Sequence, residues 1–169
     1  MKREVLVLTG ACGVGKSTIG KLWAKSKSGV CIESDYFTEW IHDEHPISTD
    51  YFLSVEEMIA ELSWNTCREY LKNGFSVAIE NVWTPKGLTK LQEAFMSIEL
   101  ISKAKFVYLK CDLDQNKSRD QKRSASNQMN ERVGIVREEL EQYQWPEFVH
   151  TIDSSSQTDI QTLNTILSI

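Results

Sequence analysis

Positive charge, cysteine and long apolar runs are all in short supply in this sequence of 169 residues. Lys and Arg total 19 against 24 Asp and Glu, a formal charge of −5, which opposes a broad, sequence-independent interaction with nucleic acid. The four cysteines lie far apart without a CxxC or Cys/His metal spacing, so we expect free thiols in a reducing cytoplasm. The apolar run in MKREVLVLTG ends after four residues, too short for a signal peptide or a membrane anchor.

The overall composition is that of an ordinary globular domain. Hydrophobic residues make up 41% of the chain and charged residues 25%. These values exclude a disordered, collagen-like or fibrous protein. A chain of this length buries roughly 68 to 70% of the surface that its unfolded form exposes, enough for a sheet with covering helices. Because no repeat or low-complexity linker divides the sequence, we expect a single domain over residues 1–169.

Five short segments, rich in β-branched or aromatic residues, have the composition of buried strands. They are residues 4–9, 30–33, 75–80, 105–111 and 148–153. Between them, apolar residues recur at steps of three or four, most clearly over 55–71, which predicts amphipathic helices. This alternation predicts an α/β fold in which right-handed crossovers join parallel strands and helices cover both faces of the sheet.

Two of the expected helices carry end signals. Ser54 followed by Glu57 has the spacing of a capping box at the start of the longest helix, and Gly74 can end that helix in a left-handed conformation. In the next helix, Thr84 is expected as N-cap and Pro85 as the first helical residue, where its missing N–H costs nothing.

The first expected strand runs directly into a glycine-rich loop. GACGVGKS, residues 10–17, fits the Walker A pattern GxxxxGK[ST], and a chance match in a chain this long is on the order of one in a hundred. Glycines let backbone N–H groups approach phosphate oxygens at a helix N-terminus. Lys16 would then bridge the β- and γ-phosphates, Ser17 would bind Mg²⁺ and Thr18 would reach the α-phosphate. The alternative is a glycine-rich turn with an incidental lysine. The residues expected to bind ATP or GTP here are Gly10, Cys12, Gly13, Val14, Gly15, Lys16, Ser17 and Thr18.

Polar residues follow the next two strands, at the sheet edge where ligands of parallel sheets bind. Asp35 can act as general base towards an acceptor hydroxyl, or can simply cap a helix. Glu80 is suited to hold a Mg²⁺-bound water in the manner of a Walker B carboxylate. Asn81 can bind the acceptor, or can cap a turn.

The stretch 117–137 is polar and carries four arginines. Arg119 and Arg123 are four apart and share a helix face, whereas the turn formers of 124–130 interrupt that helix before another begins. We interpret this stretch as a mobile flap; the alternative is a solvated, salt-bridged pair of surface helices.

Taken together, the chain resembles the small-molecule kinase branch of the phosphate-loop fold, which contains gluconate kinase, shikimate kinase and chloramphenicol phosphotransferase. The resemblance rests on GACGVGKST, on ESD and IEN after strands two and three, and on RDQKR after strand four. It implies a three-layer P-loop NTPase sandwich with a five-stranded parallel sheet in the order 2-3-1-4-5. It further implies a helical lid, about 117–137, over ATP, and Mg²⁺-dependent transfer of the γ-phosphate to a small hydroxylated acceptor.

The resemblance also implies roles for single residues. Arg119 resembles the lid arginine that stacks on adenine, and Arg123 resembles the catalytic one that reaches the transferring phosphate, alongside Lys16 and Asp35. Arg132 or Arg137 is a second candidate from the far side of the lid. Ser154, after strand five, lies in a segment whose backbone resembles the one facing the adenine edge.

The acceptor side departs from the family patterns. Glu33-Ser34-Asp35 replaces the usual pair of aspartates, and no triple glycine follows strand three. The acceptor therefore stays open among sugar acids, antibiotics and ring alcohols. Trp40 and Trp83 follow the two strands and can line its pocket, although core packing is the commoner fate of a single Trp.

Three other functions compete with a small-molecule kinase. A GTP switch needs Asn-Lys-x-Asp and Asp-x-x-Gly, whereas Arg119 stands where the first motif needs its aspartate and no glycine follows Glu80 in the second. A kinase of polynucleotide 5′-hydroxyls or nucleotide sugars would want a basic track to Asp35, but residues 38–50 are acidic. The third is a nucleotide-binding regulator without catalysis.

Overall fold

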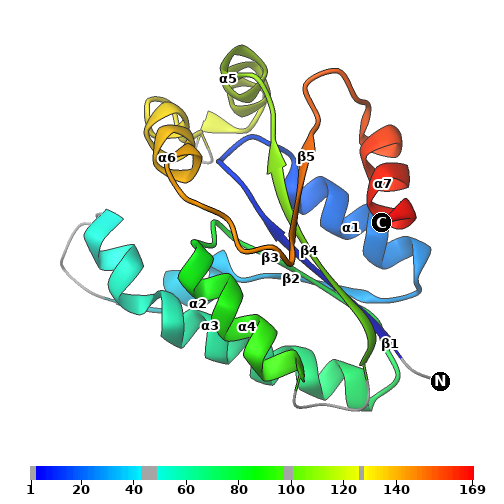
Figure 1. Cartoon of the computed structure of the whole chain (residues 1–169). Coiled ribbons are helices and arrows are strands. Elements are labelled where there is room, and N and C mark those ends of the chain that lie inside the picture. The colour runs from blue at the N-terminus through cyan, green and yellow to red at the C-terminus, as the bar shows by residue number, and fades with distance from the viewer. Residues whose placement is uncertain (1–2, 43–48, 97–100, 126–127) are drawn as a thin grey trace.

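A computed structural model describes residues 3–42, 49–96, 101–125 and 128–169. Within these ranges the chain forms one five-stranded parallel sheet in the order β2-β3-β1-β4-β5 (Figure 1). The strands are β1 (Arg3–Thr9), β2 (Val30–Glu33), β3 (Val77–Glu80), β4 (Ile101–Lys110) and β5 (Val149–Asp153). The α/β fold and the strand order predicted from the sequence are therefore confirmed.

Two strands differ from the prediction by more than one residue at their start. β3 begins two residues late because the N–H of Phe75 donates to Tyr70 O, which makes Phe75 part of the preceding helix end. β4 begins four residues early, at Ile101, because its first residues pair with the start of β1 across the sheet. Such pairing is a long-range interaction that local composition does not reveal.

Helices cover both faces of the sheet (Figure 1). One face carries α1 (Lys16–Ser26) and α7 (Asp159–Ser168). The other carries α2 (Asp35–Glu39), α3 (Thr49–Lys72) and α4 (Pro85–Met96). The remaining pair, α5 (Leu113–Gln121) and α6 (Arg132–Glu141), lies beyond the carboxyl end of β4. This position leaves α5 and α6 above the edge at which the phosphate loop follows β1.

Alternate residues of the central strands enter two separate cores, as expected for a sheet covered on both faces. Val5 and Val7 of β1 pack in the cluster under α3 and α4, whereas Leu6 and Leu8 pack in the cluster under α1 and α7. These four side chains are completely buried. The central strand is thus fixed from both sides, which gives the loop after it a rigid base.

The helix ends match the sequence signals in two places out of three. Gly74 has a φ of 90°, and the bonds from its N–H to Leu71 O and from Phe75 N–H to Tyr70 O close a Schellman motif. Thr84 accepts the N–H of Lys86 at 3.2 Å and so caps α4.

The capping box predicted at Ser54 is wrong. The helix α3 begins at Thr49, which places Ser54 inside it. No glycine or proline stands between these two residues, so nothing in the chain prevents the helix from starting a turn earlier. Glu57 does not cap either: its carboxylate pairs with Lys86 at 2.7 Å.

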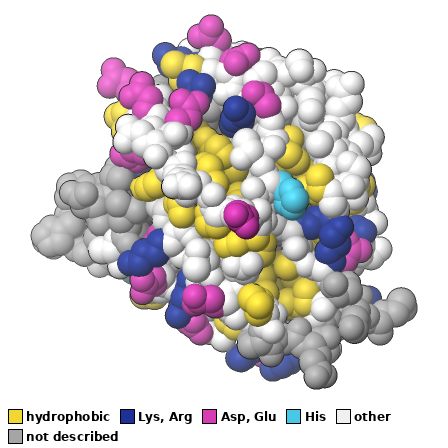
Figure 2. Space-filling view, in the orientation of Figure 1, with side chains coloured by type: hydrophobic (Ala, Val, Ile, Leu, Met, Phe, Trp, Pro, Cys, Tyr) yellow, Lys and Arg dark blue, Asp and Glu magenta, His cyan; other side chains and the backbone are white. Residues whose placement is uncertain are grey.

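On the face shown in Figure 2, acidic side chains gather over α6, while Lys and Arg side chains are scattered among them and elsewhere. Across the described part of the chain, no helix is both long enough and apolar enough to cross a membrane.

Candidate active site

The phosphate loop adopts a conformation that only glycine accommodates easily. Gly10, Gly13 and Gly15 have φ angles of 148°, 79° and 104°. A Cβ at Gly10 would lie 2.4 Å from Leu109 O, and one at Gly13 would lie 2.7 Å from Asn116 O. The loop is therefore pressed against the end of β4 and the first turn of α5. Both the positive φ values and this close approach explain the glycines of the Walker A pattern.

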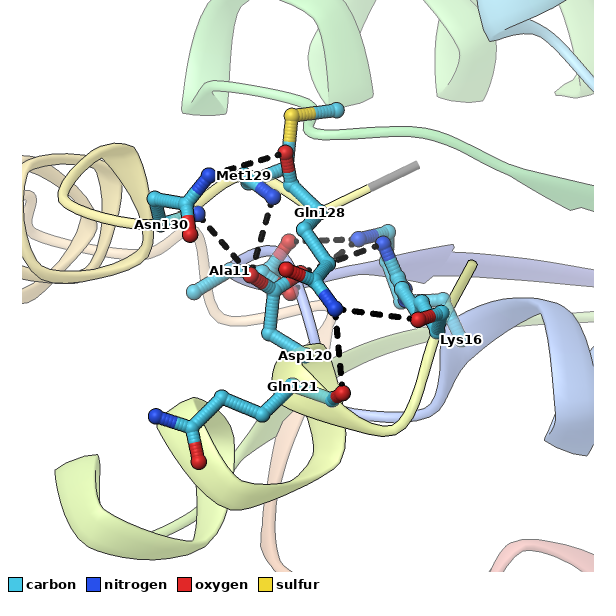
Figure 3. Close-up of polar contacts among 9 residues, drawn as sticks. Ala11, Lys16, Asp120, Gln121, Gln128, Met129 and Asn130 are labelled. Atoms are coloured by element: carbon cyan, nitrogen blue, oxygen red, sulfur yellow. Dashed lines mark hydrogen bonds and ion pairs between the residues drawn. The ribbon is translucent and has the colours of Figure 1, made fainter. Parts of the chain in front are cut away.

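The Lys16 side chain lies inside the loop. It is 8% exposed, and its Nζ donates hydrogen bonds to Gly10 O at 2.9 Å and to Ala11 O at 3.2 Å (Figure 3). Gly15, in the left-handed conformation, is the N-cap of α1, so the free N–H groups of that helix open on the same loop. A buried ammonium group beside a helix N-terminus is a favourable environment for phosphate.

Ser17 and Glu80, the two expected Mg²⁺ ligands, are brought together. The Ser17 hydroxyl donates to Glu80 Oε1 at 2.7 Å, and Glu80 is only 2% exposed. Burial raises the pKa of Glu80 above its usual value; Lys16 and the Ser17 hydrogen bond lower it, and the charges of Asp35 and Glu33 raise it again. No group of three His, Cys, Asp or Glu side chains in the described residues could hold a metal by itself. A Mg²⁺ ion bound through Ser17 and Glu80 would therefore complete its oxygen shell with phosphate and water.

We expect Glu80→Gln to stabilise the nucleotide-free protein at neutral pH while impairing turnover. Because the folded pKa of Glu80 is raised, the stability linked to its protonated form is complete below the ordinary pKa of Glu and is lost as the pH rises through the raised value. The neutral amide avoids that loss, so the melting temperature should rise at pH 7 and converge with the wild type in acid. Turnover should fall about 10- to 100-fold, as for other residues that orient a metal's ligands. A lower melting temperature at pH 7 would contradict this account.

Asp35 is the first residue of α2, its side chain is exposed, and the charge of Lys16 in the phosphate loop acts on it. Desolvation by the surrounding protein raises the pKa of this carboxyl. The positive charges of Lys16, Arg132 and Arg123 offset part of the rise. The helix cap position belongs to Ser34, which makes no capping hydrogen bond through its side chain, so the alternative role of Asp35 as N-cap is wrong.

Asn81 has the turn-capping role considered for it, and its contact with the acceptor stays a prediction. Its Oδ1 accepts the N–H of Val82 at 2.8 Å, which is the turn-capping arrangement. Its backbone N–H donates to Leu8 O, so the residue is held against the end of β1. The side chain is fully buried, and its Nδ2 has no hydrogen-bond partner in the described residues. An unpaired buried donor beside Glu80 is costly unless something accepts from it.

The two tryptophans have opposite environments. Trp83 is 0% exposed and packs in the core under α3 and α4, so the prediction that it lines an acceptor pocket is wrong. The cause is Thr9, whose hydroxyl donates to Trp83 O at 2.7 Å and accepts Trp83 N–H at 2.9 Å, fixing the backbone at the core's edge. Trp40 is 69% exposed and makes an edge contact with Phe37, so its ring is accessible near the end of α2.

Glu56 is a residue that the sequence analysis did not identify. It is 1% exposed on α3, and its carboxylate accepts the N–H of Thr84 at 2.6 Å and the Thr84 hydroxyl at 2.7 Å. Burial raises the pKa of Glu56, and the two bonds from Thr84 lower it. A Cβ at Gly87 would lie 2.5 Å from Glu56 Oε1. Glu56 thus fixes the start of α4 and the loop that follows Glu80; a lone glutamate in a helix carries no sequence signal for this.

The four arginines between β4 and β5 separate into three environments. Arg119 donates to Val14 O at 3.0 Å and so lies against the phosphate loop. Arg123 and Arg132 act on the charge of Asp35. Arg137 pairs with Glu141 at 2.7 Å, and its charge acts on Asp153. Of the two alternatives left open by the sequence, Arg132 rather than Arg137 is the one whose charge acts on Asp35.

Ser154 lies in the turn after β5 and is 2% exposed. Its N–H and its hydroxyl both donate to Lys110 O, at 2.8 Å and 3.2 Å. These bonds hold the turn beside the end of β4. The contact of Ser154 with adenine stays a prediction. Among the loop residues, Cys12 is half-buried and Thr18 is exposed at the start of α1.

A family model described as AAA domain matches residues 5–144. No curated protein matches the chain. A sugar kinase from Janibacter sp. HTCC2649 superimposes with a TM-score of 0.70 at 21% identity, covering 100% of this chain and 96% of that one. A gluconokinase from Sinorhizobium meliloti 1021 superimposes with a TM-score of 0.65 at 19% identity, covering 99% of this chain and 92% of that one. The APS kinase of Mycobacterium tuberculosis superimposes with a TM-score of 0.67 at 13% identity, covering 99% of this chain and 96% of that one.

Proposed function

The chain belongs to the AAA-domain family and has the fold of P-loop small-molecule kinases, and on this premise we propose that it is an ATP-dependent phosphotransferase. The γ-phosphate would pass to a hydroxyl group of a small molecule such as a sugar acid, an antibiotic or a ring alcohol. The family match covers the phosphate loop, Asp35, Glu80 and the lid arginines. The similar APS kinase is described in complex with AMPPNP and APS, which supports both an adenine nucleotide and a small acceptor.

One arrangement carries the proposal: Lys16 lies in the phosphate loop, Arg119 donates to that loop, and the charges of Lys16, Arg123 and Arg132 act on Asp35. Lys16 would move from its loop carbonyls to the β- and γ-phosphates. Asp35 would accept the proton of the acceptor hydroxyl. Arg123 would neutralise charge that spreads over the γ-oxygens, and closure of the lid around it would exclude water.

Mg²⁺, when bound, shields the phosphate charges and orients the γ-phosphate for in-line transfer. Ser17 and Glu80 are already in contact and would hold the ion and its water. Glu80 would keep its negative charge more easily with a cation beside it, because that charge opposes the burial that raises its pKa. The chain thus fits the ion with the two residues expected from the sequence.

The acceptor would lie beside Asp35, and three side chains are candidates to contact it. The Asn81 Nδ2 is a buried donor without a partner in the described residues. Trp40 offers an exposed ring surface. Within the same described ranges, Arg132 is the one arginine whose side chain makes no hydrogen bond or ion pair. A hydroxylated compound with a ring or an anionic group suits this set.

A nucleic acid acceptor fits the surface poorly. Acidic side chains gather over α6 on the face shown in Figure 2, and no continuous basic stripe crosses that face. A long polyanion needs such a stripe. We also propose a cytoplasmic location, which is supported by the four free cysteines.

The acidic limb of the pH–rate profile should report Asp35. Only the ionised carboxylate accepts a proton, so kcat/KM should rise with pH through a pKa above the ordinary aspartate value. Arg132→Ala removes a charge that lowers this pKa and should shift the limb to higher pH. Arg137→Ala is the matched control, because Arg137 pairs with Glu141 instead. If the pH–rate profile of Arg132→Ala is not shifted, the acidic limb does not report the ionisation of Asp35.

The direct test is transfer of label from γ-labelled ATP to a panel of sugars, sugar acids, aminoglycosides, nucleosides and ring alcohols. We expect label in at least one small hydroxylated compound, dependent on Mg²⁺ and on Lys16. Tight ATP binding without transfer to any class would instead support a nucleotide-binding regulator. Transfer only to an oligonucleotide 5′-hydroxyl would replace the small-molecule acceptor with a polynucleotide.

A further inference from the structure

Asp120 is a buried carboxylate that the proposed mechanism does not use. It lies in the last turn of α5, one residue before the helix ends at Gln121, and is 2% exposed. Its Oδ2 accepts two backbone hydrogen bonds, from Met129 N–H at 2.8 Å and from Asn130 N–H at 2.9 Å (Figure 3). One carboxylate oxygen therefore ties the residues that lead into α6 to the end of α5.

A second side chain ties the same two places together. The Gln128 amide Nε2 donates to Gln121 O and to Arg123 O, at 3.0 Å in both cases (Figure 3). Like the bonds of Asp120, these bonds join the residues before α6 to the C-terminal end of α5. Polar side chains of this stretch and of α5 therefore form hydrogen bonds that join the end of α5 to the start of α6.

The other oxygen of Asp120 faces an arginine of the site. Asp120 Oδ1 lies 3.7 Å from Arg123 Nη1 and has no hydrogen-bond partner in the described residues. Arg123 is one of the two arginines whose charge acts on Asp35, and the other, Arg132, begins α6 directly after the tied residues. Asp120 therefore contacts both halves of the segment that carries these arginines.

We propose that Asp120 is a positioning residue of the lid. It fastens the start of α6 through Met129 and Asn130, and it holds the Arg123 guanidinium in place through charge. The part concerning Arg123 rests on the proposed function, in which that arginine reaches the γ-phosphate. Asp120 touches no reacting atom in this scheme and acts through the arginines.

Two substitutions separate the attachment of the start of α6 from the positioning of the Arg123 guanidinium. Asp120→Asn keeps an oxygen that can accept the two amide hydrogens but removes the charge facing Arg123. Asp120→Ala removes both. Asp114→Asn is the matched control, because Asp114 is an exposed aspartate in the first turn of the same helix.

Hydrogen exchange measures the fastening without any ligand. Protection of the Met129 and Asn130 amides should fall about 10- to 100-fold in Asp120→Ala, the range for hydrogen bonds to a charged group. It should stay within about threefold of the wild type in Asp120→Asn and in the control, because an acceptor oxygen remains. Unchanged protection in Asp120→Ala overturns the fastening; if that variant fails to fold, the same exchange measured on Asp120→Ser, whose shorter side chain does not reach both amides, decides it in the same way.

Nucleotide preference measures the effect on Arg123. Calorimetry with a non-hydrolysable ATP analogue and with ADP gives the affinity gained from the γ-phosphate. This gain should fall about tenfold in Asp120→Asn, Asp120→Ala and Arg123→Ala, and the double variant Asp120→Asn/Arg123→Ala should be no weaker than Arg123→Ala alone. ADP affinity and the control should stay unchanged. Additive losses, or a lower melting temperature with an unchanged γ-phosphate gain, overturn the positioning role.

The two proposals fail in different ways. If the wild type binds the analogue more tightly than ADP but phosphorylates no acceptor, the phosphotransferase proposal fails and the double-mutant result still decides the role of Asp120. If the wild type shows no gain from the γ-phosphate, Arg123 is not a γ-phosphate ligand and the holding role falls with it, while hydrogen exchange decides the fastening.

Discussion

Lys16→Ala should bind a non-hydrolysable ATP analogue about 10- to 100-fold more weakly than the wild type, and turnover should fall about 100- to 1,000-fold. The ammonium group is buried and its only hydrogen-bond partners in the described residues are the carbonyls of Gly10 and Ala11. A triphosphate offers charged acceptors in place of these neutral ones, and charge-assisted bonds are roughly twice as strong. Because charge on the γ-phosphate changes most during transfer, turnover should lose more than affinity.

The matched control is Lys25→Ala, an exposed lysine in the last turn of the same helix. It removes one positive charge without touching the loop, so neither the affinity nor the turnover should change appreciably. Calorimetry and a γ-labelled ATP assay provide the two measurements. Wild-type affinity in Lys16→Ala would show that the loop does not bind the triphosphate, and the kinase proposal would fail with it.

Asp35→Asn should lower phosphate transfer about 100- to 10,000-fold, the usual contribution of a general base, and should leave ATP affinity within a few-fold of the wild type. The amide has the shape of the carboxylate but takes up no proton at neutral pH. The charges of Lys16, Arg123 and Arg132 act on Asp35, and its side chain is exposed rather than committed to a helix cap. The side chain is therefore available to an acceptor hydroxyl.

Glu39→Gln, an exposed acidic residue at the end of the same short helix, controls for the loss of one negative charge. Transfer should be unaffected in that variant. Full activity in Asp35→Asn would remove the general base from the mechanism, whereas equal loss of ATP affinity and transfer would indicate that Asp35 supports the nucleotide site instead. Retained binding with lost transfer separates an enzyme from a nucleotide-binding regulator.

Local sequence was enough to predict much of this protein. Residues 10–17 specify the phosphate loop because three left-handed glycines, a lysine and a serine are a chemical requirement at fixed spacing. The strands followed from short runs of β-branched and aromatic residues, and the placement of Asp35 and Glu80 followed from the rule that parallel strands end at one edge. The strand order and the fold came from the family resemblance and are confirmed.

Contacts between distant segments decided the rest. The sequence leaves Trp83 open between pocket and core, and the two hydrogen bonds with Thr9 place it in the core. It likewise leaves Arg132 and Arg137 equivalent, and the pairing of Arg137 with Glu141 distinguishes them. Glu56 belongs to no motif, and Asp120 lies in RDQKR, where the sequence analysis assigned it no role. Each accepts backbone N–H from a segment outside its own helix, a contact that no local pattern records. The motifs specify which residues bind a phosphate, whereas tertiary contacts decide which charged side chains stay available to a ligand.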